Sequence, residues 1–287
     1  MEDNERLITF LNFDHTLTKQ KFLHQFPHHW IDCSDIPHTN GFCQPDSLQM
    51  IRDKLREQHA SPLVLIGNGN YHYVTYLLME RIKEPFSLVL FDHHDDMKES
   101  EFLISCGSWV SYALKNVTIL NKVCIIGVNE KHITQPNRNT NGRVKIITER
   151  KLNISPLNHI LDEVQTFLKG EKNIYISIDK DVLYKKEAFT NWDQGSMTLV
   201  QLLFMLEFLS ARFRIAGMDI CGEYLLNGSN VFKAESREYI KMNEIVNGAL
   251  IRFIYDLQNR QDPSEESSFG QAGASFIDNQ GTLNGNM

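Results

Sequence analysis

Short apolar runs alternate with longer amphipathic stretches along most of the chain. The runs contain four to seven residues, are rich in β-branched side chains and are bounded by polar residues or glycine. These features are typical of strands buried on both faces of a parallel sheet. The runs cover residues 7–13, 63–66, 88–91, 123–128, 144–147, 174–178 and 215–220.

Between these runs, apolar residues recur with the 3.6-residue period of a helix. The helical stretches cover residues 46–59, 71–83, 109–114, 155–168, 199–213 and 235–259. Ser196 or Thr198 is placed to cap the fifth helix, and Ser155-Pro156 is a suitable start for the fourth. Strands that alternate with helices predict a three-layer α/β/α fold, in which helices cover both faces of a mostly parallel central sheet.

A single domain is expected over residues 1–260. From residue 261 onward the sequence is rich in Gly, Ser and Asn, contains no Lys or Arg, and has no periodicity. We therefore expect residues 261–287 to form a disordered acidic tail.

The composition argues against several classes of function. Of the 287 residues, 42% are hydrophobic, and the net charge of −7 differs from the basic surface of a general nucleic-acid binder. No apolar stretch approaches the 18 residues that suggest a membrane span, and the charged residues 1–6 do not resemble a secretion signal. The five cysteines are scattered, none in a CxxC pair, which indicates reduced thiols in a cytoplasmic protein.

Polar side chains gather where three of the predicted strands end. One strand runs into Asp92-His93-His94-Asp95-Asp96, another runs into Asp179-Lys180-Asp181, and a third is followed, after a glycine-rich turn, by His72. Taken singly, these segments have ordinary interpretations: a solvated loop, a common D-x-D pair and a helix-capping histidine. Because parallel strands end at one edge of a sheet, the three segments together predict a shared metal site.

The types of ligand indicate which metal is expected. Four Asp and two His of these segments could converge at one edge of the sheet. Such a site, with no thiolate, favours Mn²⁺ or another hard ion over structural zinc. Four carboxylates around one ion would carry too much negative charge, whereas two ions that share bridging carboxylates balance it.

These segments resemble, in the same order, the motifs of the arginase/agmatinase (ureohydrolase) superfamily. Residues 92–96 resemble D-A-H-x-D, residues 177–181 resemble S-x-D-x-D, and residues 69–73 resemble G-G-D-H-S, with its histidine kept as His72. Residues 195–198 are similar to G-G-L-T, and residues 126–128 are similar to I-G-x-R. The resemblance covers residues 60–250, leaves the first 60 residues as a divergent part, and implies an arginase-like fold.

The resemblance also implies a binuclear manganese hydrolase with two Mn²⁺ ions per chain. Six residues would hold the ions: His72 and Asp96 on one, His94 and Asp181 on the other, with Asp92 and Asp179 bridging both. A hydroxide between the ions would attack a guanidinium carbon and release urea. Asp96 would also hold that hydroxide and take part in proton transfer.

The chain departs from the family pattern around the substrate. The carboxylate that holds guanidinium in the D-[IL]-x-E motif arrives one position late, as Glu223 after Gly222. Either a bulge turns Glu223 into the site, or the guanidinium contact has changed. Cys106 stands in place of a histidine proposed to shuttle protons, and it is either a thiol tuned to donate a proton or a buried filler.

The region after Asp96 bears on the substrate. Residues 97–101, Met-Lys-Glu-Ser-Glu, do not reproduce the pattern of Asn and Ser residues with which arginases read the carboxylate and amine of free arginine. The pattern is similar to a branch that includes peptide arginases, so the expected substrate is arginine within a peptide, converted to ornithine, or a small guanidino compound.

Further candidates lie near the N-terminus and beyond the second D-x-D strand. Residues 12–16 resemble the D-x-D-x-T loop of haloacid-dehalogenase phosphatases, but the amide of Asn12 cannot form an aspartyl-phosphate. Asp14 and His15 either line the substrate pocket or cap their own loop. Trp192 is a further candidate for substrate contact.

A histidine-rich stretch runs from His24 to His38. Its spacings fit no standard zinc pattern, and Pro27 and Pro37 favour a loop. We interpret it as a partly exposed flap over the edge that carries the active site.

Three functions follow from this reasoning. The first is a binuclear manganese hydrolase that acts on arginine, most simply within a peptide. The second keeps the metals but acts on another linear amidine or amide, as an agmatinase does. The third is a binding protein that retains metal without catalysis. No signal in the sequence indicates an oligomeric state, and no nucleic-acid or membrane partner is expected.

Overall fold

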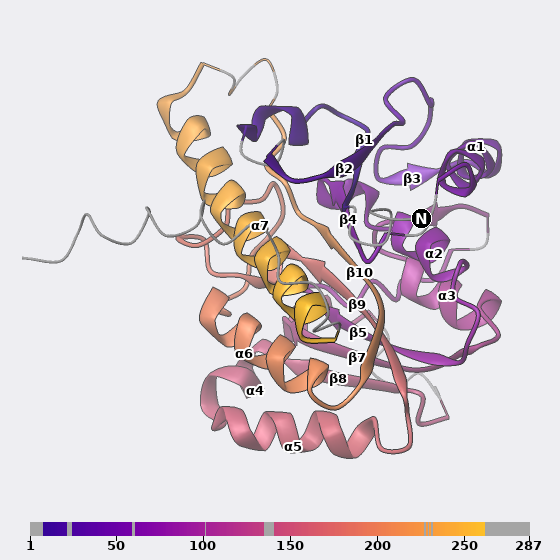
Figure 1. The fold of residues 1–287 in the computed structure, drawn as a ribbon, viewed down its shortest axis with the longest axis vertical. Helices are drawn as coiled ribbons and strands as arrows, with labels where there is room; N and C mark the ends of the chain where they lie inside the picture. Colours follow the sequence, from indigo (N-terminus) through magenta and orange to yellow (C-terminus); the bar gives the residue numbers. More distant parts are fainter. Residues whose placement is uncertain are drawn as a thin grey trace, which may run out of the picture.

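Eight parallel strands form the centre of the molecule. The computed structural model describes residues 8–21, 25–58, 61–100, 102–134, 141–226, 228, 230 and 232–261. The strand order is β2-β1-β4-β10-β9-β5-β7-β8, and each neighbouring pair is parallel (Figure 1). The bounds are β1 Ile8–Asn12, β2 His28–Asp32, β4 Leu63–Gly67, β5 Phe86–Phe91, β7 Leu120–Val128, β8 Val144–Thr148, β9 Asn173–Asp179 and β10 Arg214–Cys221.

Helices cover both faces of this sheet, as predicted. One face packs against α1 (Pro45–Arg56), α2 (Val74–Met79) and α3 (Trp109–Asn116). The other packs against α4 (Glu149–Ile154), α5 (Leu157–Phe167), α6 (Leu199–Ser210) and α7 (Ala234–Gln261) (Figure 1). Successive strand residues alternate between the two cores, so that Leu88 and Leu90 face α1–α3 while Val89 and Phe91 face the opposite layer. The three-layer α/β/α fold is therefore confirmed.

Short elements connect these layers. A two-stranded antiparallel sheet pairs β3 (Phe42–Cys43) with β6 (Ile104–Ser105). Single 3₁₀ turns follow four of the strands: η2 (Leu17–Lys19), η4 (Gly69–Tyr71), η5 (Glu130–His132) and η6 (Lys180–Val182). Thr198 caps α6 in a capping box with Gln201, as the sequence predicted.

The histidine-rich stretch differs from its prediction. His28–Asp32 is not a flap but the edge strand β2, in register with Ile8–Asn12 of β1. Pro27 precedes the strand, so its missing N–H breaks no ladder. Stacking of the His28 ring on Phe10, with centroids 4.8 Å apart, and an edge contact from Trp30 at 6.0 Å hold the strand in place. His24 and the predicted tail beyond Gln261 lie outside the described residues.

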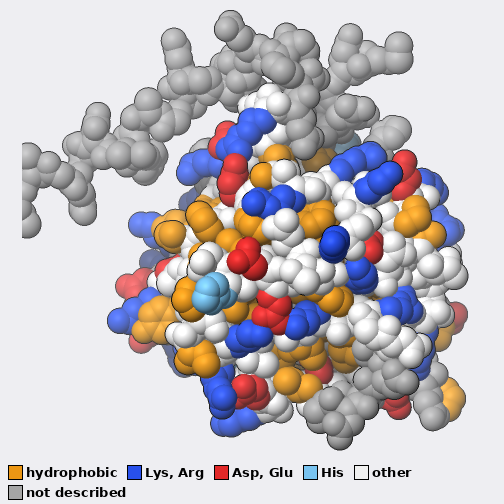
Figure 2. Space-filling view, turned by 90° about the horizontal axis from the view of Figure 1, so that it is seen from below, with side chains coloured by type: hydrophobic (Ala, Val, Ile, Leu, Met, Phe, Trp, Pro, Cys, Tyr) orange, Lys and Arg blue, Asp and Glu red, His pale blue; other side chains and the backbone are white. Residues whose placement is uncertain are grey.

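One helix prediction needs correction, and the helix α4 was not predicted. The helix expected over residues 71–83 is limited to α2, because a 3₁₀ turn capped by the Asn68 side chain precedes it. The stretch before α5 contains a separate helix, α4, which Thr148 caps. In the part of the chain that the structure describes, no helix is long and apolar enough to cross a membrane. On the face shown in Figure 2, basic, acidic and apolar side chains are intermixed.

A buried polar network joins α7 to the carboxyl edge of the sheet. Lys180, 0% exposed, forms an ion pair with Glu223, which is 3% exposed. The Glu223 carboxylate also accepts hydrogen bonds from Gln20 at 2.5 Å, Asn247 at 2.6 Å and Asn243 at 3.2 Å. Burial lowers the pKa of Lys180, and the negative charge of Glu223 opposes this shift. The network satisfies both charges inside the protein, a condition that buried charges require.

This network predicts strongly non-additive effects on stability. Lys180→Met and Glu223→Gln should each lower the free energy of unfolding by about 3–5 kcal/mol, since each leaves the other charge buried alone. The double variant should recover most of that loss. Urea denaturation of the full chain measures all three values. The exposed pair Arg214 and Glu84 is the control, because Arg214→Met should cost at most about 1 kcal/mol. Additive losses in the Lys180 and Glu223 variants would contradict the assignment.

Candidate metal centre

The six predicted ligands converge at the carboxyl edge of the central strands. Asp92 follows β5 directly, Asp179 ends β9, and His72 follows η4 after β4. Five of the six side chains are buried, and the sixth, His94, is 21% exposed. Their convergence follows from the strand order, because β4, β10, β9 and β5 are adjacent and all parallel.

The first group of ligand atoms surrounds His72. Its Nδ1 lies 3.3 Å from Oδ2 of Asp92, 3.2 Å from Oδ2 of Asp96 and 3.7 Å from Oδ2 of Asp179. Its other nitrogen, Nε2, lies 2.9 Å from the Ser177 hydroxyl, which in turn donates to Asp219 at 2.7 Å. Ser177 and Asp219 thus form a chain of hydrogen bonds on the far side of the His72 ring. This chain orients the ring, as the outer partners of metal-binding histidines do.

The second group surrounds His94. Its Nδ1 lies 2.9 Å from Oδ2 of Asp181 and 3.5 Å from Oδ1 of Asp92. Asp92 thus turns one oxygen toward each imidazole and belongs to both groups. A carboxylate in this position is suited to bridge two ions about 3.5–4 Å apart.

Backbone amides hold the carboxylates in place. Asp92 accepts a hydrogen bond from the backbone N–H of His94 at 2.6 Å, Asp181 from that of His93 at 3.0 Å, and Asp179 from that of Asp181 at 2.9 Å. Asp96 has a φ of 49°, in the left-handed region that non-glycine residues rarely adopt. Such backbone strain is often found at functional sites.

The electrostatics of this cluster require added positive charge. Burial, together with the charges of Asp179 and Asp92, raises the pKa of Asp181, and burial and the charge of Asp92 raise the pKa of Asp96 to about 7. Burial alone would lower the pKa of His94, but hydrogen bonds to Asp181 and Asp92 outweigh it and raise the pKa to about 12. Protons thus supply the compensating charge in these groups. Carboxylates and imidazoles in this arrangement are equally able to bind divalent cations in place of those protons.

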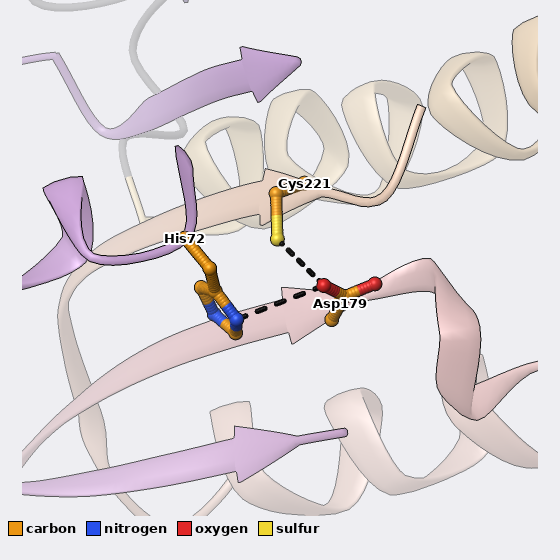
Figure 3. A group of neighbouring side chains, drawn as sticks. All are labelled: His72, Asp179 and Cys221. Atoms are coloured by element: carbon orange, nitrogen blue, oxygen red, sulfur yellow. Dashed lines mark hydrogen bonds and ion pairs between the residues drawn. The ribbon is translucent and has the colours of Figure 1, made fainter. Parts of the chain in front are cut away.

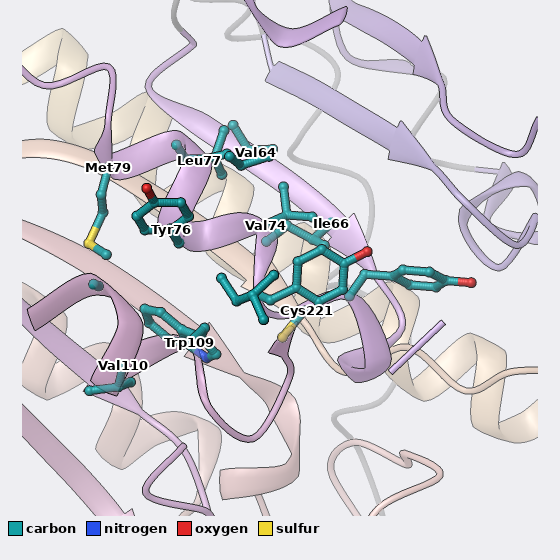
Figure 4. Close-up of a cluster of buried hydrophobic side chains, with 14 of the residues drawn as sticks. Val64, Ile66, Val74, Tyr76, Leu77, Met79, Trp109, Val110 and Cys221 are labelled. Carbon is teal, nitrogen blue, oxygen red and sulfur yellow. The ribbon is translucent and has the colours of Figure 1, made fainter. Parts of the chain in front are cut away.

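Two residues that the sequence analysis missed complete the cluster. The Cys221 thiol lies 3.1 Å from Oδ2 of Asp179, and Figure 3 shows the sulfur and the His72 ring directed at this carboxylate. The Trp109 indole N–H donates to Oδ2 of Asp96 at 2.7 Å. Both residues border the apolar core of β4 and α2 (Figure 4). Cys221 lies within the altered D-I-x-E segment, which is the one signal in the sequence that points to it.

Cys106 lies close enough to the cluster for the charges of its carboxylates to affect the pKa of the thiol. Burial raises the pKa of its thiol to about 12, and the negative charge of Asp96 adds to the rise. Its backbone N–H donates to the carbonyl of Gly41 at 3.0 Å, which fixes the loop. The thiol is therefore protonated at neutral pH, and a catalytic role for Cys106 stays a prediction.

Glu223 does not contact the His/Asp groups in this structure. The pairing of β10 with β4 shifts register between Ile220 and Cys221, so a bulge is present as the sequence suggested. The bulge, however, directs Glu223 to Lys180, and both of its oxygens are engaged in the α7 network. Gly222, with a φ of 89°, could not carry a side chain here, since a Cβ would lie 2.5 Å from Oδ1 of Asp179. Neither carboxylate oxygen of Glu223 is therefore available for the contact with guanidinium that the sequence suggested.

Of the remaining substrate candidates, Asp14 and His15 lie in the loop after β1, and Trp192 lies beside His94. Oδ1 of Asp14 accepts hydrogen bonds from the N–H and hydroxyl of Thr16, at 3.1 and 2.7 Å, which is loop capping. Its Oδ2 is buried without a hydrogen-bond partner among the described residues. His15 is exposed and hydrogen-bonds to Asn12 within the loop. Trp192 is 41% exposed, and its ring lies 5.7 Å from that of His94.

Two known proteins have sequences that align with part of this chain. An uncharacterized protein of Thermotoga maritima is 36% identical over 163 residues, which are 56% of this chain and 58% of that protein. A formimidoylglutamase of Halalkalibacterium halodurans is 28% identical over 171 residues, or 57% of this chain and 54% of that protein. The chain thus aligns with little more than half the length of these two relatives.

Among solved structures, the proclavaminate amidino hydrolase of Streptomyces clavuligerus has the same fold. It superposes with a TM-score of 0.61 at 15% identity, over 88% of this chain and 93% of that one. The sequence profile described as Arginase family matches residues 11–222. With most of its length and its central sheet covered by this match, the chain belongs to the arginase family.

Proposed function

We propose that this protein is a binuclear manganese hydrolase that cleaves guanidino or amidino groups. The observation that carries the proposal is the pair of His/Asp groups that share Asp92, one built around His72 and the other around His94. Asp179, 3.7 Å from Nδ1 of His72 and bonded through its other oxygen to the N–H of Asp181, is the second candidate for a bridging ligand. When bound, two Mn²⁺ ions would supply an activated water as the nucleophile.

The protein's own residues would position that water and manage its proton. The Trp109 N–H holds Oδ2 of Asp96, so that Oδ1 of Asp96 is the atom at which we place the proton taken from the water. Ser177 and Asp219 would keep the His72 ring in one orientation during the reaction. Cys106 would be a proton donor only as a neutral thiol.

For the substrate we propose an arginine side chain within a peptide. Trp192 is exposed beside His94 and offers a flat ring on which a guanidinium can stack. The loop of Asp14 packs against the loop that carries His72, since Phe13 stacks on Tyr71 with centroids 4.4 Å apart. We propose that Asp14, whose buried Oδ2 has no hydrogen-bond partner among the described residues, supplies the carboxylate for the cation in place of Glu223.

A second amidine substrate has support of its own. The family's guanidinium-binding carboxylate is absent from the His/Asp groups, and one relative of this chain is a formimidoylglutamase. A formimino group or the guanidinium of agmatine would be cleaved by the same ligands. The choice among these substrates depends on the side chains that contact the substrate, for which Asp14 and Trp192 are our candidates.

Removal of the shared ligand tests the metal centre. Asp92→Asn should reduce bound Mn²⁺ from two ions per chain, measured by plasma mass spectrometry. Product release should fall by more than about 100-fold, since even the outer partners of metal ligands typically contribute 10- to 100-fold. Mn²⁺ should raise the Tm of the wild-type chain and not that of the variant. The exposed Asp162 on α5 provides the control Asp162→Asn. Two tightly bound ions in Asp92→Asn would contradict the assignment.

A panel of substrates identifies the bond that is cleaved. The Mn²⁺-loaded protein is incubated with a peptide that contains an internal arginine, and separately with free arginine, agmatine and formiminoglutamate. We expect the highest kcat/KM for the peptide, with urea as a product. Preference for formiminoglutamate, with formamide released, would favour the second substrate class. Two bound ions and no product from any compound would favour a binding protein without catalysis.

The role of Asp14 is tested separately from that of the metals. Asp14→Asn keeps the oxygen that caps Thr16 and removes the negative charge, so KM for a cationic substrate should rise about tenfold or more. The two bound ions should be retained. Asp35→Asn changes an exposed carboxylate beyond β2 and should leave KM unchanged. An unchanged KM in Asp14→Asn would exclude the proposed contact.

A further inference from the structure

A third set of metal-binding side chains lies at the rim of the cluster, apart from the two groups assigned to Mn²⁺. It consists of His93, His132 and Asp193, which come from the loop after β5, from η5 and from the loop before α6. One potential ligand atom from each lies within 4.8 Å of the others. His93 stands at the alanine position of the D-A-H-x-D motif, and the proposed hydrolysis uses none of the three residues.

Their distances suit a small four-coordinate ion. Nε2 of His132 lies 3.0 Å from Oδ2 of Asp193, and Nε2 of His93 lies 3.7 Å from the same oxygen. Ligands bound at about 2.0–2.2 Å in a tetrahedron around zinc are about 3.4 Å apart, midway between these values. The two imidazole rings are inclined by 68°, so the rings are not stacked on one another.

The burial of His93 is a second observation that points to a ligand. Its side chain is only 1% exposed, yet Nδ1 has no hydrogen-bond partner among the described residues. Its Nε2 faces Asp193 at a distance too long for a hydrogen bond. A buried imidazole normally has its polar atoms satisfied. An ion would bind Nε2, which forms no hydrogen bond among the described residues, while Nδ1 would carry the proton of the neutral ring.

The surrounding backbone fixes His93 and brings His132 to it. The N–H of His93 donates to Asp181 at 3.0 Å, and its carbonyl accepts from the N–H of Asn129, at the start of η5, at 3.0 Å. Asp95 accepts from the N–H of Thr134 at 2.7 Å and ties down the other end of the same turn. The His132 side chain therefore lies between two anchored positions of its loop.

We propose that His93, His132 and Asp193 form a third cation site, selective for Zn²⁺ or a similar borderline metal. Two imidazoles and one carboxylate are a ligand set that zinc uses when it keeps a fourth position open. The His132 and Asp193 side chains are 30% and 63% exposed, so the open position faces solvent. The set contains two nitrogen ligands and one oxygen ligand, in contrast to the carboxylate-rich pair of groups, and this difference separates the metal preferences of the two centres.

The count of bound ions tests this proposal without reference to catalysis. The full chain is stripped with a chelator, loaded with Mn²⁺ and Zn²⁺ together, dialysed and analysed by plasma mass spectrometry. Total bound metal should be one ion per chain higher in the wild type than in His132→Ala or Asp193→Asn. This difference does not depend on how many ions occupy the groups around Asp92, nor on which of the two metals occupies them.

Two further variants separate the third site from its neighbour. Asp92→Asn should keep the ion that His132→Ala loses, and the exposed His159→Ala on α5 should keep the wild-type count. With Co²⁺ in place of Zn²⁺, visible absorption of a tetrahedral site should appear in Asp92→Asn and disappear when His132→Ala is added. Equal metal counts in wild type and His132→Ala, or a count that falls equally in His159→Ala, would overturn the proposal. Wild-type and His132→Ala circular dichroism spectra verify that both are folded.

Discussion

Burial of negative charge at the carboxyl edge of the central strands is the constraint on which the rest of the structure depends. Asp92, Asp96, Asp179 and Asp181 are at most 7% exposed, and their contacts are to imidazoles, backbone amides, an indole and a thiol. Such a cluster is costly unless cations or protons compensate it. The parallel sheet makes the cluster unavoidable, because four adjacent strands end at one edge. The two-metal centre that we propose is the most direct solution to this electrostatic problem.

The altered position of Glu223 is linked in the structure to Lys180, which lies between the two aspartates of the D-x-D segment. A charged Lys180 between two ligand aspartates would be expensive alone, and so would a buried Glu223 one position beyond its usual place. The two residues form an ion pair, and the amides of Gln20, Asn243 and Asn247 satisfy the remaining polar atoms. Glu223, which stands near the place of the family's guanidinium-binding carboxylate, instead helps to attach α7 to the sheet. The contact of Asp14 with the substrate that we propose would take its place.

Much of the molecule could be predicted from residue types and their spacing. The central strands, the two helical layers and the shared polar edge follow from apolar periodicity and from polar residues at strand ends, and the resemblance to the family selects the six candidate ligands among them. The failures have particular causes. The edge strand β2 contains two histidines and an aspartate among its five residues, so it lacks the apolar run of a buried strand. Cys221 and Trp109 were not among the predicted site residues, because such side chains ordinarily pack in the core; they do so here, but their polar atoms also reach the cluster.

By itself, the sequence determined most of the central strands and covering helices and the candidate metal ligands at the strand ends, because these depend on neighbours along the chain. Only the tertiary structure decided which partner each buried charge meets. Lys180 and Glu223 are 43 residues apart, and His132 and Asp193 are 61 residues apart. Their contacts depend on strand order, on loop anchors and on one bulge after Ile220. A shift of one residue turns a side chain to the opposite face of a strand, and no pattern in the sequence specifies on which side of that shift Glu223 lies.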